Sequence, residues 1–418
     1  NDFLTLKYHH KQLVIFRFLY FYNYLLWSIP KKVNSIICMK NKSTVLILVI
    51  ILLLQSCASL RIPTIYDGEK NGVTELNLKA SDKSLVHLED GLPEFTEWAD
   101  DKAVKKYSSL EEMLGKTNTT SFVVMKNGEL LYENYFNGIE QGGRTQIFSV
   151  TKAFTTSVLG IAIQEGKIKS MDQSVSDFIP EFKEGDLSKI TLFHLVQMQS
   201  GLNYDEYKRV FQTLKYYNRK NSRSAFASLK LKHEPGTVFK YKSIDTQILG
   251  ECIEHAVGQP FLDYAKEKLF SKLEFQDPIA WSVDSKESGQ IKYYGGLNIS
   301  GRDLVKFGEL ILNNGFVGDE QILNPYTSTI YKDATCRNQD DKYCNGWWFN
   351  TFDDDNEVYF AAGFRGQMLF INKKSGVTIA RLGENKGGLY WYDMLKELSI
   401  QLGDSHEFPQ LENDIAEK

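Results

Sequence analysis

Ser149 and Lys152, within the segment FSVTKAF, are the residues whose types and spacing best suit covalent chemistry. Three positions apart on a helix, their side chains lie on one face. The residues that follow are apolar, and burial lowers the pKa of a lysine, so that a neutral amine can accept the serine proton. A helix that begins near Phe148 also offers the N–H groups of its first turn to a developing oxyanion. The pattern predicts a nucleophilic serine with a lysine as its base.

The same residues also fit a structural role. Ser149 can cap the helix while Lys152 points into solvent. A second Ser-x-x-Lys match, from Ser28 to Lys31, shows that residue frequencies alone produce such a motif in a chain of 418 residues. The motif taken alone therefore leaves both interpretations open.

Two later segments carry further candidates. In PGTVFKYKS, Tyr241 precedes an expected helix and adjoins Lys242, so its phenol can serve as a proton carrier or simply as a half-buried aromatic. In AAGFRGQ, a strand ends at Gly363, and small residues there let another backbone or a substrate approach closely. The N–H of Phe364 would then be a second oxyanion donor beside that of Ser149.

A sheet assembled from both ends of the chain is the expected scaffold for these segments. Residues 121–136 alternate in polarity around Asn127-Gly128, which is a strong hairpin signal. Residues 357–383 return to strand patterns, whereas residues 171–290 are mostly helical in pattern. The sequence therefore predicts an α+β fold, with an antiparallel sheet built from N- and C-terminal strands, packed by helices, and a mostly helical inserted region.

The region around Met39 has the layout of an export signal. Lys40 and Lys42 precede an apolar run over residues 45–54, and the ending LQSC resembles a bacterial lipobox, in which Cys57 is lipidated. We expect a lipoprotein that is anchored to the membrane in the bacterial cell envelope, in the periplasm or at the outer membrane. The alternative is a true membrane helix over residues 13–29.

The expected organisation follows from these patterns. We expect upstream sequence translated in error over residues 1–38, a lipoprotein signal peptide over 39–56, a lipidated cysteine with a tether and lead-in over 57–100, a catalytic domain over 101–405 and an acidic tail over 406–418.

Charge and cysteine content limit the classes of partner. The net charge of −4 is mild and no basic stripe occurs, which argues against nucleic acid as a partner. The seven histidines are scattered and no CxxC is present, so neither a metal nor another cofactor is expected. Cys336 and Cys344 are close enough in sequence to close a surface loop in an exported protein, or they are two unrelated thiols.

Taken together, the three motifs resemble those of the serine β-lactamase-like hydrolases. The resemblance covers roughly residues 100–405, and YKSIDTQILGECIEHAVG, NGWWF and GFRGQMLFI look most like 6-aminohexanoate-dimer hydrolases and related carboxylesterases. It implies that Ser149 is the acylated nucleophile, that Lys152 is its base and that Tyr241 relays a proton to the leaving group. The N–H groups of Ser149 and Phe364 would form the oxyanion hole.

One departure from the family pattern concerns the third motif. Many members carry Lys-Thr-Gly or His-x-Gly where this chain has Ala361-Ala362-Gly363, so the cation that would hold a β-lactam carboxylate is absent. Ser243 stands where many members have Asn. The candidates for the substrate pocket are Ser243, Gly363, Arg365, Tyr207 and Trp347, with Arg365 as a possible partner for a substrate carboxylate.

These observations lead to one expectation and two alternatives. We expect an exported, lipid-anchored serine hydrolase that cleaves a small-molecule ester or amide through an acyl-enzyme at Ser149. A peptidoglycan or D-amino-acid peptidase, or a β-lactamase, would use the same fold and nucleophile. A non-catalytic envelope module that only binds is the other alternative.

Overall fold

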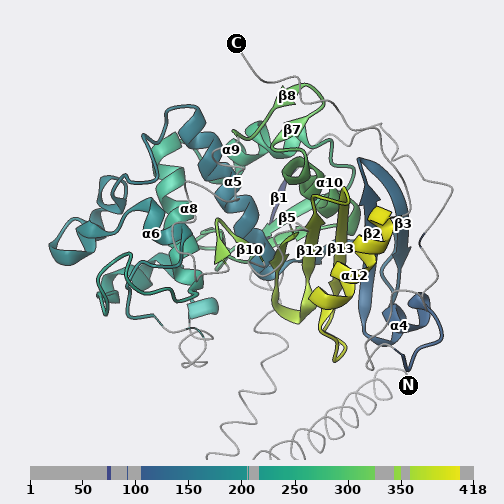
Figure 1. The fold of residues 1–418 in the computed structure, drawn as a ribbon. Coiled ribbons are helices and arrows are strands. Elements are labelled where there is room, and N and C mark those ends of the chain that lie inside the picture. The colour runs from purple at the N-terminus through teal and green to yellow at the C-terminus, as the bar shows by residue number, and fades with distance from the viewer. Residues whose placement is uncertain are drawn as a thin grey trace, which may run out of the picture. The chain divides into compact units, whose positions relative to one another are not determined.

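A seven-stranded antiparallel sheet is the centre of the computed structural model, which describes residues 73–76, 92, 105–204, 206, 216–324, 343–349 and 358–404 (Figure 1). The strand order is β3-β2-β13-β12-β11-β10-β9. The strands are β2 (Thr119–Lys126), β3 (Glu129–Tyr135), β9 (Tyr343–Cys344), β10 (Trp347–Phe349), β11 (Val358–Ala362), β12 (Met368–Asn372) and β13 (Val377–Gly383).

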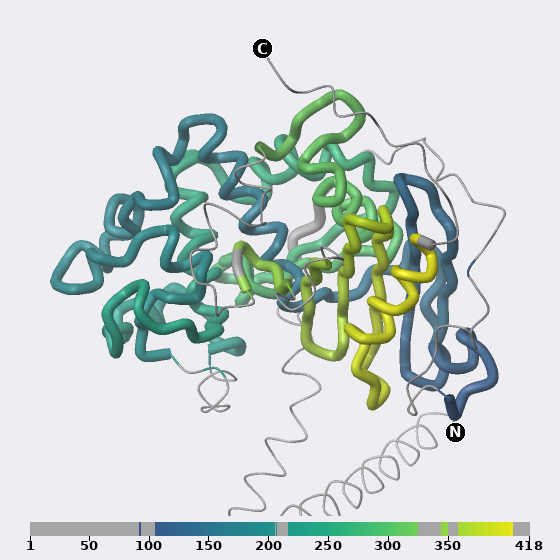
Figure 2. Tube along the Cα trace, in the orientation of Figure 1, coloured from purple at the N-terminus to yellow at the C-terminus, as the bar shows by residue number. Residues whose placement is uncertain are grey.

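This sheet joins the two ends of the described chain. Strand β13 pairs with β2, so that Ile379 lies opposite Val124. Figure 2 shows the same arrangement, with the blue early segment beside the yellow late segment. The predicted α+β fold, with a sheet built from N- and C-terminal strands, is confirmed.

Alternate residues of the strands face two separate layers of helices. Phe122 and Val124 pack with helix α12 (Trp391–Asp404), whereas Val123 lies in the core on the side of helix α10 (Gly301–Leu312). A short helix, α4 (Leu110–Lys116), packs beside β2 on the α12 side. Period-two alternation thus gives one strand two apolar surfaces, because both faces of the sheet are covered.

The middle of the chain forms the helical part, which lies to the left of the sheet in Figure 1. Its helices are α5 (Thr151–Gln164), α6 (Leu192–Val196), α8 (Ser243–Val257) and α9 (Phe261–Lys268). Short 3-10 helices connect the elements: η3 (Phe148–Val150), η4 (Val175–Asp177), η5 (Pro180–Phe182), η6 (Gly185–Lys189), η7 (Ser222–Ser228), η8 (Phe270–Lys272) and η9 (Phe364–Gly366).

A second sheet departs from the predicted pattern. It has the order β1-β5-β6-β4, from β1 (Val73–Leu76), β5 (Ile279–Ser282), β6 (Leu297–Ile299) and β4 (Thr145–Gln146). Residues 57–100 were expected to be an irregular tether, but β1 pairs with β5 along its whole length. The VTEL segment contains polar residues and gave no strand signal, and its partner strand lies far away in the sequence. A small hairpin, β7 (Phe316–Val317) with β8 (Glu320–Gln321), follows α10.

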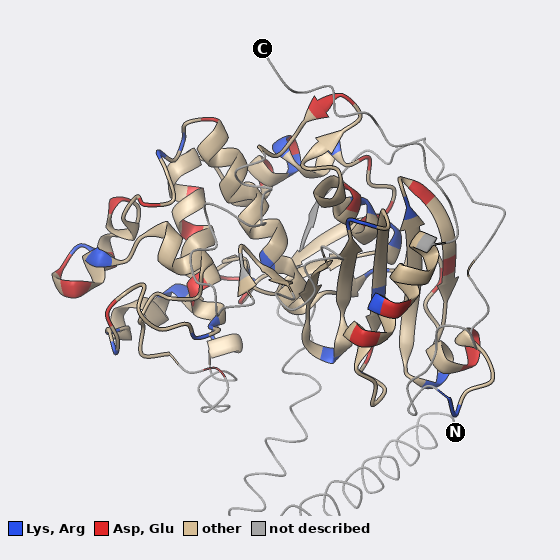
Figure 3. Ribbon diagram, viewed as in Figure 1, with Lys and Arg blue, Asp and Glu red and all other residues tan. Residues whose placement is uncertain are grey.

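Other expectations concern segments or properties outside this fold. The predicted signal peptide, Cys57 and the acidic tail lie outside the described residues. Among the helices that the structure describes, none combines the length and apolarity needed to cross a membrane. Figure 3 shows that the positions of basic and acidic residues are interspersed along the described elements, in keeping with the mild net charge.

Helix α5 is enclosed by protein on every side. Its residues from Thr151 to Ala162 are buried, as the nearly uniform apolarity of the sequence predicts. The Phe154 ring stacks on Phe307 with 3.7 Å between ring centroids, which fastens α5 to α10. The first turn of α5 follows directly on η3, and this junction carries Ser149.

The turn between β9 and β10 presses directly on the backbone of α5. Asn345 and Gly346 both have positive φ, of 49° and 88°, and Gly346 packs so closely that a Cβ atom there would lie 2.7 Å from Cα of Ala153. The hydroxyl of Thr156 donates to the Asn345 carbonyl at 2.6 Å. This close approach brings β10 against the part of α5 that bears Lys152.

We predict that Gly346→Ala destabilises the protein by about 1–3 kcal/mol more than Gly318→Ala does, because only the first substitution pushes a methyl group into α5. Gly318 is the matched control: its φ is also positive, at 56°, but nothing lies within 4 Å of the position of its Cβ. Denaturant unfolding of both variants measures the difference. Equal losses of stability would show that the contact with α5 contributes nothing.

Candidate active site

Ser149 and Lys152 are in direct contact at the junction of η3 and α5. The Nζ atom of Lys152 donates to Ser149 Oγ at 2.9 Å and to the carbonyl oxygen of Tyr294 at 2.9 Å. Ser149 is half-buried, whereas the Lys152 side chain is only 1% exposed. The alternative in which Lys152 points into solvent is therefore wrong.

Burial changes the proton affinity of this amine. Loss of solvent lowers the pKa of Lys152 to about 8, while the negative charge of Glu206 acts in the opposite direction. At that pKa, roughly a tenth of the amines are neutral at pH 7, which is far more than for a solvated lysine. The arrangement thus provides a base next to the hydroxyl that it would deprotonate.

The aromatic ring of Tyr241 lies close to the Lys152 amine. Nζ of Lys152 is 5.0 Å from the centroid of the Tyr241 ring, which is 8% exposed. The ring stacks on Trp348 at 5.7 Å and meets Tyr343 edge-on at 5.3 Å. Tyr241 is followed by α8, as predicted, and aromatic packing fixes the position of its ring.

The end of β11 lies against the backbone that carries Ser149. A Cβ atom on Gly363 would lie 2.3 Å from the carbonyl oxygen of Ile147, so glycine alone permits this approach. The rings of Phe148 and Phe364 meet edge-on with 5.5 Å between centroids. The two segments that carry the predicted oxyanion donors, Ser149 and Phe364, are therefore neighbours.

Arg381 holds the turn that contains Phe364, and sequence reasoning did not identify it. Its buried guanidinium donates to the carbonyl of Gly366 at 2.9 Å and to that of Arg365 at 3.2 Å. It also donates to Asn385 at 2.9 Å and stands over the Trp391 ring at 4.4 Å. A buried arginine within a strand gave no local signal of this function, because its acceptors at Arg365 and Gly366 belong to another turn.

A cavity of about 110 Å³ opens in front of Ser149, and its walls are mostly aromatic. The lining residues are Phe148, Ser149, Tyr204, Glu206, Tyr216, Tyr217, Ser243, Tyr294, Gly295 and Phe364. The four tyrosines among them were not identified as site residues from the sequence. The only available signal was the pairing of tyrosines at 216–217 and at 293–294.

Glu206 brings a carboxylate into this cavity. Its oxygens accept hydrogen bonds from the backbone N–H of Ser243 at 2.6 Å and from the Ser243 hydroxyl at 2.9 Å. Ser243 lines the cavity as predicted, and its hydroxyl is directed to Glu206.

Two other pocket candidates lie elsewhere. Trp347 was expected to line the cleft, but it is 1% exposed and stacks on Phe307 in the core. Its neighbour Trp348 points the other way, toward Tyr241, because successive strand residues face opposite sides. Arg365 is not among the residues that line the cavity, although its guanidinium lies 5.7 Å from the centroid of the Phe148 ring.

Two further sequence predictions fall outside what the structure describes. Tyr207 and Cys336 are not among the described residues, and only the backbone of Cys344 is described, as part of β9. The predicted loop disulfide and the pocket position of Tyr207 stay predictions.

Comparison with known proteins agrees with this geometry. A model of the beta-lactamase family matches residues 108–388. The 6-aminohexanoate-dimer hydrolase of Paenarthrobacter ureafaciens is 23% identical over 305 residues, which cover 68% of this chain and 76% of that protein. A D-aminopeptidase of Cereibacter sphaeroides is 27% identical over 227 residues, which cover 53% of this chain and 39% of that protein.

Solved structures show the same fold. A Bacillus anthracis protein assigned as a 6-aminohexanoate-dimer hydrolase superposes with a TM-score of 0.68 at 22% identity, covering 82% of this chain and 93% of that chain. A D-stereospecific amidohydrolase from a Streptomyces species superposes with a TM-score of 0.53 at 16% identity, covering 67% and 93%. The resemblance to serine β-lactamase-like hydrolases is thereby confirmed.

We predict that Glu206→Gln lowers the pKa of Lys152, because it removes the negative charge that raises it. The rate at which Ser149 reacts with a fluorophosphonate probe should rise with pH as the Lys152 amine loses its proton, with a midpoint near 8 in the native protein. In the variant this midpoint should move to lower pH. Glu320→Gln, on the remote β8 strand, is the control and should leave the midpoint in place. An unchanged or higher midpoint for Glu206→Gln would refute the electrostatic coupling.

Proposed function

Because this chain belongs to the beta-lactamase family, we propose that it is a serine hydrolase which cleaves an ester or amide bond through an acyl-enzyme at Ser149. One observation carries the proposal: the buried amine of Lys152 lies 2.9 Å from the Ser149 hydroxyl oxygen. Such a pair can generate an alkoxide without a histidine.

The acylation step uses the side chains of Ser149, Lys152 and Tyr241 and the backbone of Phe364. Neutral Lys152 accepts the proton of Ser149, whose oxygen attacks the carbonyl carbon of the substrate. The N–H groups of Ser149 and Phe364 donate to the resulting oxyanion. Tyr241, beside Lys152, passes a proton to the leaving oxygen or nitrogen, and the bond to the leaving group breaks.

Water completes the cycle. With the leaving group gone, a water molecule donates its proton toward Lys152 and Tyr241 and attacks the acyl carbon, which releases the acid and restores the Ser149 hydroxyl. The same residues thus transfer protons in opposite directions in the two halves of the reaction.

The aromatic walls of the cavity favour a carbon chain as the acyl part of the substrate. Phe148, Tyr216, Tyr217 and Tyr294 give flat apolar surfaces, and polar groups are few. An amide as the scissile bond is supported by the relatives named as a dimer hydrolase, a D-aminopeptidase and an amidohydrolase. The same acyl-transfer chemistry can also cleave an ester.

We predict that Ser149→Ala lowers the hydrolysis of 4-nitrophenyl butyrate by roughly a thousandfold or more, because no other group replaces the nucleophile. Ser271→Ala is the matched control, since Ser271 is exposed and its hydroxyl only donates to the Glu267 carbonyl. Thermal unfolding of both variants verifies that they fold. Equal rates for Ser149→Ala and the native protein would exclude the acyl-enzyme.

A β-lactamase or penicillin-binding activity is the second candidate, and relatives on the same fold keep it open. Ala361, which is fully buried, stands where a cation would be needed for a β-lactam carboxylate. Labelled penicillin should therefore leave the native protein unlabelled. Covalent labelling that disappears in Ser149→Ala would favour this candidate instead.

A further inference from the structure

Arg381 is completely buried in β13, and its guanidinium is bound mostly by backbone carbonyls. Its N–H groups donate at 2.9–3.2 Å to the carbonyls of Arg365, Gly366, Thr117 and Asn385 and to the hydroxyl of Thr119. A guanidinium has five N–H donors, so each of them has an acceptor here. The same group stands 4.4 Å over the Trp391 ring of α12. One side chain therefore joins several segments that are separate in the sequence.

The charge of Arg381 has no carboxylate partner in the part of the chain that the structure describes. Arginine is almost never fully buried unless it is paired, and burial of a charge costs free energy unless its hydrogen bonds are satisfied. Here neutral carbonyl oxygens and one aromatic ring take the place of a counter-charge. An apolar residue would leave these carbonyls without a donor. The position therefore requires the planar fork of a guanidinium.

The turn from Gly363 to Gln367 contains two of the carbonyls that Arg381 binds. Arg365 has a φ of 67°, in the left-handed region that residues other than glycine rarely adopt. Such a conformation costs free energy and persists only where surrounding contacts hold it. At Gly366, a Cβ atom would lie 2.7 Å from Nη1 of Arg381. The guanidinium thus packs directly against the turn that it binds.

The direction of the Phe364 N–H follows from this turn. The N–H of Gly366 donates to the carbonyl of Gly363 at 3.2 Å. That carbonyl belongs to the same peptide unit as the N–H of Phe364, and in a planar trans peptide the two bonds point in opposite directions. Fixing Gly366 therefore also fixes the direction of the Phe364 N–H.

We propose that Arg381 is a positioning residue of the oxyanion hole, which directs the Phe364 N–H toward the substrate carbonyl at Ser149. It acts through the two carbonyls of the turn, and it does not line the cavity itself. An oxyanion donor acts mainly in the transition state, so its misalignment lowers kcat more than it raises KM. This inference rests on the hydrolase function proposed for the chain.

The first experiment measures the hydrolysis of 4-nitrophenyl butyrate and of its thionoester, in which sulfur replaces the carbonyl oxygen. Sulfur is a weak hydrogen-bond acceptor, so the ratio of kcat/KM for the two esters reports on the oxyanion hole. Arg381→Lys keeps the charge but loses the fork. For this variant we expect kcat on the butyrate ester to fall roughly tenfold or more, with KM within about threefold of the native value. The oxo-to-thiono ratio should fall with kcat.

Further variants separate positioning from a loss of stability. Gly366→Ala places a methyl group against Nη1 of Arg381 and should lower the same ratio. Gly388→Ala is its matched control, because φ is also positive there, at 76°, and nothing lies within 4 Å of the Cβ position. Ile379→Ala removes a fully buried side chain two residues away on β13, so it should destabilise the protein but leave the ratio in place.

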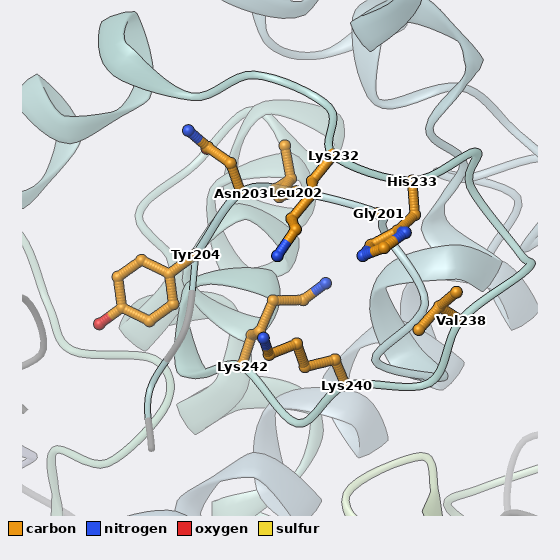
Figure 4. A pocket seen from close by; sticks show the side chains of 9 residues that line it. All are labelled: Gly201, Leu202, Asn203, Tyr204, Lys232, His233, Val238, Lys240 and Lys242. Carbon is orange, nitrogen blue, oxygen red and sulfur yellow. The ribbon is translucent and has the colours of Figure 1, made fainter. Parts of the chain in front are cut away.

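A remote surface variant completes the comparison. Figure 4 shows a second cavity, whose lining comes from residues 201–204 and 232–242 and includes no residue of the turn or of β13. Lys232, which lines it, is exposed. Lys232→Ala should therefore keep the native rate and the native ratio.

An unchanged oxo-to-thiono ratio in Arg381→Lys would overturn the proposal, and so would an equal loss of the ratio in Ile379→Ala. The ratio compares two substrates in one sample, so it does not depend on the fraction of a variant that folds. If Arg381→Lys does not fold at all, Gly366→Ala decides the outcome. Native activity that survives Ser149→Ala would refute the hydrolase function itself, and with it this proposal.

Hydrogen exchange tests the hold on the turn without any substrate. Amide exchange is followed by mass spectrometry on peptides that span residues 363–367, with peptides of α5 as the internal reference. In Arg381→Lys the turn should exchange roughly tenfold faster than in the native protein, because local opening becomes easier. Native-like exchange in the turn would show that Arg381 does not hold it, whatever the activity of the variant.

Discussion

The removal of the Lys152 amine from water is the interaction on which the arrangement of this protein depends. A solvated lysine is protonated at neutral pH and cannot accept a proton from a serine. Burial lowers its pKa to about 8, but burial of an ammonium group costs free energy unless it has hydrogen-bond acceptors. The carbonyl of Tyr294 and the hydroxyl of Ser149 provide these acceptors. The remaining architecture keeps water away from the amine while it leaves the serine accessible.

Several distant elements contribute to that enclosure. Helix α5 is buried around its whole circumference, and the turn at Gly346 closes on its backbone from one side. Tyr241, stacked on Trp348, places its ring 5.0 Å from the Lys152 amine. Glu206 acts against the effect of burial, so the proton affinity of Lys152 is a balance between desolvation and one nearby carboxylate. Tighter packing around the amine would therefore change the pKa of Lys152 as well as the stability of the protein.

The sequence allowed the local parts of this arrangement to be predicted, because short spacings determine them. The contact between Ser149 and Lys152 needs only a helical turn, and the hairpin around Asn127-Gly128 needs only a turn signal and alternation. The tyrosine walls of the cavity at Ser149 could not be predicted, since their residues meet through contacts between distant segments. Trp347 shows the same limit. In a strand of three residues, the pattern could not tell which of two adjacent tryptophans faces the core.

The pairing of β13 with β2 has a consequence for the order in which the chain can become active. Synthesis produces Ser149 and Lys152 early, whereas Phe364 and the strands that flank it come near the end. Until those strands join the sheet, β2 and β3 form an isolated two-stranded ribbon, which is marginally stable in water. A nascent or truncated chain that ends before β11 contains Ser149 and Lys152 but lacks Phe364, which we propose as the second oxyanion donor. On this proposal, the site around Ser149 is complete only after the C-terminal strands have joined the sheet, because β13 pairs with β2.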